Sequence, residues 1–335
     1  MGFEVWLWLL FGILIAAFLI VDLGITNRQP KKMSMRAAGL QASFWVAISL
    51  LFGLVIYFFY DPPGVITAHD AAWQYYTAYV TEYALSVDNI FVIIIILRYF
   101  NVEEKYHHKI LFWGILGALV MRGIFILLGA YLIAQFNWIL IIFGVFLLYT
   151  GLKMLLFKDS GDMNLDENGV LKFARRYLNF TSRDADGKFY IRENGRLLFT
   201  PMFLVLLLIE STDLIFAVDS IPAAFAITQD QVVLYTSNIF AIMGLRAMFF
   251  LLAGILDKFY LLKKGLSLVL IFIGGKMMLY ELPHYIPGLE GVSFKMPTAA
   301  SLSVIVLLLG GSIVLSLLFP RKKGLATSQG TVSPK

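Results

Sequence analysis

The stretch Glu82-Tyr-Ala-Leu-Ser-Val-Asp-Asn-Ile90 has a counterpart further along the chain, Asp213-Leu-Ile-Phe-Ala-Val-Asp-Ser-Ile221. Both place acidic residues six positions apart in apolar sequence. Two further matches follow in the same order, an arginine segment and a Gly-x-Lys segment. Matched acids and arginines inside apolar segments rarely arise by chance, so the sequence predicts an internal repeat. The matching positions are Arg122 with Arg246, Gly151 with Gly274, and Lys153 with Lys276.

The composition around these stretches is that of a membrane protein. The 335 residues are 59% hydrophobic and 15% charged, whereas soluble domains are about a quarter charged. The sequence has no cysteine, which excludes disulfides, thiolate metal sites and cysteine-based catalysis. Its net charge of +5 does not indicate nucleic-acid binding, because the basic residues gather between apolar segments, as in inner-membrane proteins.

Hydropathy predicts an all-α polytopic protein, because a span needs about 20 apolar residues. We expect nine transmembrane helices, at Val5–Ile25, Ala37–Tyr60, Gln74–Phe100, Lys109–Ala134, Trp138–Phe157, Pro201–Ile227, Val232–Leu256, Gly265–Tyr280 and Ala299–Phe319. With this count the basic loops fall on one side, beginning with Arg28, Lys31, Lys32 and Arg36. The N-terminus is therefore expected outside and the C-terminus in the cytoplasm.

Each repeat holds three spans, so the second copy must enter the membrane from the opposite side. A three-plus-three inverted repeat is typical of secondary transporters, which bind their cargo between the repeats. The expected divisions are 1–60 (two leading helices), 74–157 (repeat one), 158–199 (cytoplasmic loop), 200–281 (repeat two), 298–320 (last helix) and 321–335 (cytoplasmic tail). Within the loop, the Asn194-Gly195 pair between short apolar runs predicts a β-hairpin over Lys188–Phe199.

Ionisable residues inside the spans carry the functional prediction, since each costs roughly 2.5–3.5 kcal/mol on insertion scales. Five acids and two arginines are expected at depth, an excess of three negative charges that a divalent cation or protons would balance. A purely structural network of arginine–carboxylate pairs is the alternative. The acids are Glu82, Asp88, Glu210, Asp213 and Asp219, the expected charge partners are Arg122 and Arg246, and Asp22 lies nearer a helix end as a path residue or an interfacial one.

Oxygen ligands dominate the predicted site, with Asn89 and Ser220 beside the paired aspartates. Pro222 removes a backbone donor and predicts a break that would free the carbonyl of Val218. Such ligands favour Mg²⁺, Mn²⁺ or Ca²⁺ over Zn²⁺ or Cu²⁺, and no permanently bound cofactor is expected. The adjacent His107 and His108 are expected at a solvated helix start, with pH sensing as the alternative.

The two acidic motifs, Glu82–Val92 and Glu210–Ala223, resemble the paired signatures of the TerC family, and the length and two leading helices resemble its Alx branch. The similarity covers roughly Leu7–Phe319. The resemblance implies a bacterial inner-membrane protein that is tied to manganese homeostasis. It also implies that the cargo is Mn²⁺ and that the direction of transport is export. Carried over by motif, the cation path would comprise Glu82, Asp88, Asn89, Glu210, Asp213, Asp219 and Ser220.

The leading hypothesis is a secondary transporter that exports Mn²⁺, with exchange for protons on the same carboxylates as one mode of coupling. A non-transport membrane partner is the alternative, in metal loading of exported proteins or in redox and tellurium stress resistance, with a protein partner at loop 158–199. An intramembrane aspartyl protease is disfavoured because the sequence lacks a Gly-x-Gly-Asp motif, so the chain is expected not to be an enzyme.

Overall fold

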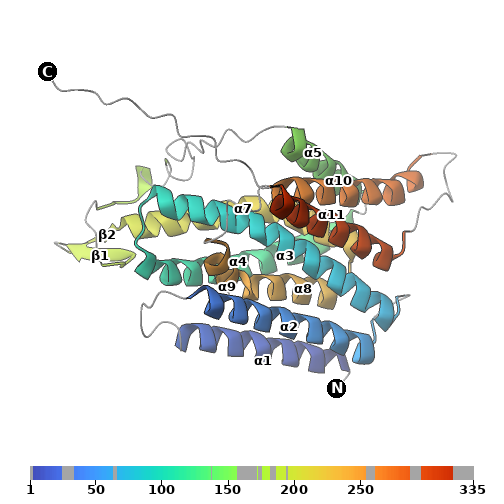
Figure 1. The fold of residues 1–335 in the computed structure, drawn as a ribbon, viewed down its shortest axis with the longest axis horizontal. Helices are drawn as coiled ribbons and strands as arrows, with labels where there is room; N and C mark the ends of the chain where they lie inside the picture. Colours follow the sequence, from blue (N-terminus) through green and yellow to red (C-terminus); the bar gives the residue numbers. More distant parts are fainter. Residues whose placement is uncertain are drawn as a thin grey trace.

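The computed structural model describes residues 3–24, 34–62, 66–136, 138–156, 172, 176–181, 186–193, 195–253, 261–286 and 296–319. In this part of the chain, the helices form an elongated bundle (Figure 1). The helices are α1 (Phe3–Gly24), α2 (Met35–Phe59), α3 (Ala68–Tyr99), α4 (Glu104–Gln135), α5 (Ile139–Leu156), α7 (Pro201–Ile227), α8 (Gln231–Met243), α9 (Leu245–Ala253), α10 (Leu262–Glu281), the 3-10 helix η3 (Leu282–His284) and α11 (Thr298–Leu318).

All nine predicted segments are helical where described, and they suit a bilayer because a helix satisfies its own backbone hydrogen bonds. Among the described residues, seven helical segments are long and apolar enough to cross a membrane: α2, α3, α4, α5, α7, the α8–α9 pair and α11. The apolar part of α1 that qualifies is shorter, Val5–Ile20, and α10 carries three lysines. Large apolar side chains such as Leu40 and Leu307 face outward. The fold is that of a polytopic membrane protein.

The centre of the bundle is formed by the helices that carry the acidic motifs. In Figure 1, α1 and α2 lie on one side, and α5, α10 and α11 lie on the other. Between them, α3 contacts α7 and α8, and α4 contacts α7. Exchanging the two repeats would turn the α3–α8 contact into the α7–α4 contact. This pairing is one that a repeat would produce. The repeat itself, its inversion and the sidedness of the termini stay predictions.

Glycines bring α5 and α10 into backbone contact. A Cβ atom on Gly274 would lie 2.9 Å from the carbonyl oxygen of Gly144, and one on Gly151 would lie 2.9 Å from that of Ser267. Small residues allow such close approach between membrane helices. The repeat-related positions Gly151 and Gly274 thus both serve this one interface.

The predicted helix break at Pro222 is wrong. Helix α7 continues through this residue to Ile227, because loss of one amide donor is tolerated where neighbouring helices hold the segment. Pro222 is buried, and the ring of Phe225 fills the space beside Gly129. The interruption occurs instead in the next predicted span, at Gly244 between α8 and α9.

Helices α3 and α4 begin more than one turn earlier than predicted. Helix α3 starts at Ala68 because Thr67 and Asp70 form a capping box: Thr67 Oγ1 accepts from Asp70 N at 3.1 Å, and Asp70 Oδ2 accepts from Thr67 N at 3.2 Å. Helix α4 starts at Glu104. The charged residues just before the predicted starts of α3 and α4 therefore belong to the first turns of these helices.

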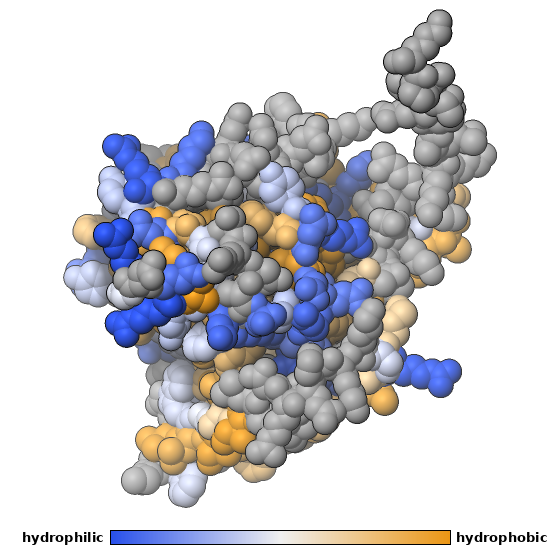
Figure 2. Space-filling model, turned by 90° about the vertical axis from the view of Figure 1, so that its left-hand side faces the viewer, coloured by the Kyte–Doolittle hydropathy of each residue, from blue (hydrophilic) through white to orange (hydrophobic). Residues whose placement is uncertain are grey.

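The predicted hairpin is present. Strands β1 (Tyr190–Glu193) and β2 (Arg196–Phe199) pair antiparallel, with Glu193 opposite Arg196. Gly195 has φ 77°, while Asn194 lies outside the described residues. The segment before β1 is tied to α4, since Lys109 Nζ donates to the carbonyl of Gly187 at 2.8 Å. The hairpin is thereby fixed to one end of the bundle, the left-hand end in Figure 1. Figure 2 shows this end of the molecule, where hydrophilic residues gather.

Candidate functional site

The centre of the site is an ion pair between two helices. Arg122 of α4 and Glu82 of α3 are each 1% exposed, and Arg122 Nη1 donates to Glu82 Oε2. The same nitrogen donates to Asn238 Oδ1 of α8 at 2.7 Å. Burying both charges carries a desolvation cost that only such pairing offsets. The pair therefore fixes α3, α4 and α8 together at the depth of the first acidic motif.

Two further carboxylates lie beside this pair on α7. Asn89 Nδ2 of α3 donates to Asp213 Oδ1 at 3.4 Å, and Asp213 is within electrostatic range of both Glu82 and Arg122. Glu210, one turn earlier, is within range of Asp213. We refer to these six residues as the Arg122 cluster: Glu82, Asn89, Arg122, Glu210, Asp213 and Asn238.

Gly117 determines where the Glu210 carboxylate lies. A Cβ atom on Gly117 would be 2.0 Å from Glu210 Oε1, so the carboxylate packs directly on the backbone of α4. Any side chain at residue 117 would displace it. The half-buried Glu210 is thus seated on α4 while remaining one turn from Asp213.

The Arg122 cluster has unsatisfied negative charge. Three carboxylates and one guanidinium give the cluster a formal charge of −2. Glu82 Oε1 and Asp213 Oδ2 are buried without a hydrogen-bond partner among the described residues. A cavity of about 30 Å³ has Asn89 and Asp213 in its wall and is otherwise apolar. This volume is room for about one or two water molecules, so Asn89 and Asp213 line a space of ionic size.

The second acid of each motif lies in a different cluster. Asp88 of α3 and Asp219 of α7 are half-buried and within electrostatic range of each other. Thr150 Oγ1 of α5 lies 3.4 Å from Asp219 Oδ1 as donor. Lys263 is within range of Asp88, and Lys153 is within range of Asp219. We refer to Asp88, Thr150, Lys153, Asp219 and Lys263 as the Asp88 cluster.

The separation follows from helix geometry. Residues six apart on a helix differ by about 240° in direction, so Glu82 and Asp88 cannot face one point. Each acid instead comes near its repeat-related partner, Glu82 near Asp213 and Asp88 near Asp219. The seven predicted ligands are consequently divided. No group of three or more His, Asp or Glu side chains within the described ranges could hold a metal ion as the structure stands.

The remaining predicted residues have separate places. Ser220 is buried on α7, and its hydroxyl has no hydrogen-bond partner in the described part of the chain. Arg246 is 2% exposed in α9. The side chain of Asp22 lies outside the described residues. Sequence reasoning missed Asn238, Thr150 and Gly117, because each acts through a neighbour that is distant in sequence.

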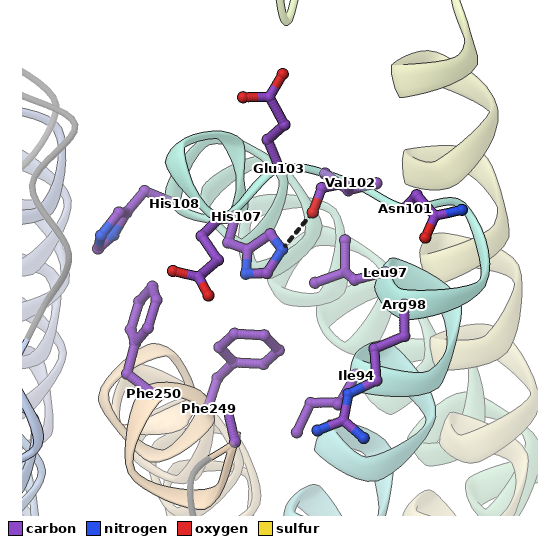
Figure 3. Close-up of a pocket in the computed structure, with 12 residues that line it drawn as sticks. Ile94, Leu97, Arg98, Asn101, Val102, Glu103, His107, His108, Phe249 and Phe250 are labelled. Carbon is purple, nitrogen blue, oxygen red and sulfur yellow. Dashed lines mark hydrogen bonds between the residues drawn. The ribbon is translucent and has the colours of Figure 1, made fainter.

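A larger cavity, about 650 Å³ in volume, lies where α3 turns into α4 and faces α9. His107 Nε2 lies 3.0 Å from the carbonyl oxygen of Val102. Figure 3 shows that the rings of Phe249 and Phe250 lie against the two histidines, with His108 centred 4.4 Å from Phe250. Both histidines lie in the first turns of α4, the expected helix start, and are half-buried there. The adjacent histidines were the only sequence signal for this cavity.

Comparison with known proteins adds a family assignment. A family model described as "Integral membrane protein TerC family" matches residues 67–324. An uncharacterized membrane protein of Myxococcus xanthus, STKORF319, is 42% identical over 94% of this chain and 93% of its own.

Other relatives carry the name "Putative membrane-bound redox modulator Alx". That of Photorhabdus laumondii is 42% identical over 83% of this chain and 87% of its own. That of Escherichia coli K12 is 40% identical over 89% and 90%. No solved structure gives a significant match.

Proposed function

The chain belongs to the integral membrane protein TerC family, and from that premise we propose that it moves a divalent metal ion across the membrane. The observation that supports this most is the Arg122 cluster. Its formal charge of −2 is the charge that one divalent cation would neutralise. Carboxylate and amide oxygens are ligands that Mg²⁺, Mn²⁺ and Ca²⁺ prefer. We propose Mn²⁺ as the cargo and export as the direction.

Binding then requires a rearrangement of the cluster. Arg122 occupies one oxygen of Glu82, and Glu210 is seated on Gly117. A cation beside Asp213 would draw Glu210 from α4 and complete a set of oxygen ligands with Asn89. Alternation between this seated position and a bound position suits a transporter, which must bind its cargo and release it.

Proton coupling fits the same residues. A carboxylate binds a cation only when deprotonated, so acidification on the side to which the site opens favours release of the metal there. The Asp88 cluster, half-buried on the same α3–α7 pair, would extend the path. Exchange of metal against protons is therefore the transport mode that we propose.

The non-transport alternative rests on the name of the relatives. The chain itself has no cysteine, so a redox role would act through metal supply or a protein partner rather than through its own thiols. The hairpin fixed to α4 offers a place for such a partner, and variants there would then matter more than the buried acids.

The test is cellular manganese, measured by elemental analysis in a manganese-sensitive host. Wild type is expected to lower cell manganese, whereas Asp213→Asn and Asp219→Asn fail to do so at equal membrane abundance. Asp186→Asn is the matched control, because Asp186 is exposed and has φ 48°, which asparagine tolerates. If both cluster variants work as well as wild type, the acids are structural and the non-transport alternative takes precedence.

A further inference from the structure

The large cavity between α3, α4 and α9 has a polar rim. Among the described residues that line it, four are carboxylates or imidazoles and one is a guanidinium. These groups lie in the last turn of α3, on the connection between α3 and α4, and on the first turn and a half of α4, and Figure 3 shows them around the pocket. They are Glu103, Glu104, His107, His108 and Arg98.

This cavity is in line with the small cavity beside Asp213. On each of three helices, a residue that lines one cavity is four positions from a residue that lines the other: Ile93 and Leu97 on α3, His107 and Leu111 on α4, and Leu245 and Phe249 on α9. Four positions are about one helical turn, roughly 5.4 Å. The two cavities therefore lie within about one turn of each other along the same three helices.

The wall between them is apolar. Leu97, Leu111 and Phe249 are at most 4% exposed, so the passage is closed in this structure. One of its three helices is short: α9 has nine residues and is separated from α8 by Gly244. Gly244 has no side chain, and glycine adopts backbone conformations that other residues rarely reach, so it is the position at which α9 can turn relative to α8. Movement of α9 alone would withdraw both Leu245 and Phe249.

We propose that the large cavity is the vestibule through which a divalent cation reaches Asp213, and that Phe249 on α9 closes the passage between them. This rests on the proposed function. A cation with six waters of about 30 Å³ each needs about 180 Å³, which the vestibule holds. The inner cavity of about 30 Å³ admits the ion only without that shell, so Asp213 and Asn89 replace water as the ion passes Phe249.

The absence of native cysteine makes this testable in the full chain. A single cysteine at Leu111 is exposed to a membrane-impermeant cationic methanethiosulfonate reagent, in otherwise wild-type protein and with Phe249→Ala. Labelling is expected to rise about tenfold with Phe249→Ala, the factor that corresponds to about 1.4 kcal/mol in an opening equilibrium. Phe249→Leu, a milder truncation, is run in parallel, because Phe→Ala leaves a cavity that can destabilise the core.

The matched control is Phe225→Ala, which truncates a phenylalanine at the cavity near the other ends of α3 and α7. It should leave labelling at Leu111→Cys unchanged. Equal labelling in the Phe249→Ala and Phe225→Ala backgrounds would contradict the proposal that the large cavity is the vestibule and that Phe249 closes it. Millimolar Mn²⁺ should slow labelling in the Phe249→Ala background, and unchanged labelling would overturn the assignment to a cation. Manganese efflux measured separately can fail while the labelling pattern holds, so the two proposals are distinguishable.

Discussion

The Arg122 cluster and the Asp88 cluster descend from the same pair of sequence motifs and yet differ in their charge balance. In the Arg122 cluster, a fully buried guanidinium holds one of three carboxylates and leaves two in excess. In the Asp88 cluster, two half-buried aspartates lie within range of two lysines that extend toward helix ends. The repeated motifs therefore determine only that acidic residues are present in both clusters. Their neighbours on other helices determine whether each negative charge is held in an ion pair, left without a counter-charge or balanced by nearby lysines.

The largest expected effect concerns the buried ion pair between Arg122 and Glu82. Arg122→Gln leaves Glu82 buried without its counter-charge, and we expect it to lower the free energy of unfolding by about 3–5 kcal/mol. The measurement is thermal unfolding in detergent together with membrane abundance. Adding Glu82→Gln should restore much of the loss, since it removes the unpaired charge. A single Arg122→Gln variant as stable as wild type would mean that the ion pair does not fix the helices.

The second prediction separates the clusters by affinity. Asp213→Asn should weaken Mn²⁺ binding to the purified protein by roughly 10–100-fold, as loss of groups around a metal does. Asp88→Asn should weaken it much less, because its side chain faces the other cluster. Calorimetric titration with Mn²⁺ measures both. If Asp88→Asn has the larger effect, the ion binds in the Asp88 cluster and the assignment is reversed.

A third, smaller effect tests the seat of Glu210. Gly117→Ala places a methyl group where the carboxylate lies, and we expect it to change Mn²⁺ affinity by about fivefold, which corresponds to about 1 kcal/mol. Gly123→Ala on the same helix is the matched control, because its Cβ would meet nothing within 4 Å. Both changes raise helix propensity equally. Identical affinities in the two variants would show that the Glu210 position is unimportant.

The smallest effect is expected at the edge of the Asp88 cluster. Lys153 is exposed on α5, so Lys153→Gln should alter stability by no more than about 1 kcal/mol, the usual range for exposed ion pairs. Thermal unfolding at low and high salt measures it. A loss comparable to that of Arg122→Gln would show that the two clusters are equally dependent on fixed charge.

Much of the fold could be predicted from apolar length alone. The nine helical segments and the hairpin are where hydropathy and the Asn-Gly turn placed them, because both signals are local. The helix break was predicted at Pro222, but the structure has it at Gly244. A proline removes one backbone hydrogen bond from a helix, and packing against neighbouring helices can compensate for that loss. The end of α8 is set by tertiary packing, which no local sequence signal reports.

The candidate site was predictable as a set of residues and not as an arrangement. By itself the sequence determined that acids and arginines lie within membrane-spanning helices and recur in two motifs, since burial and periodicity are properties of each segment. Only the tertiary structure decided that Arg122 pairs with Glu82, that Asn89 reaches Asp213 and that Gly117 seats Glu210. Such contacts join residues far apart in the chain, and they depend on how α3, α4, α7 and α8 rotate and pack against one another.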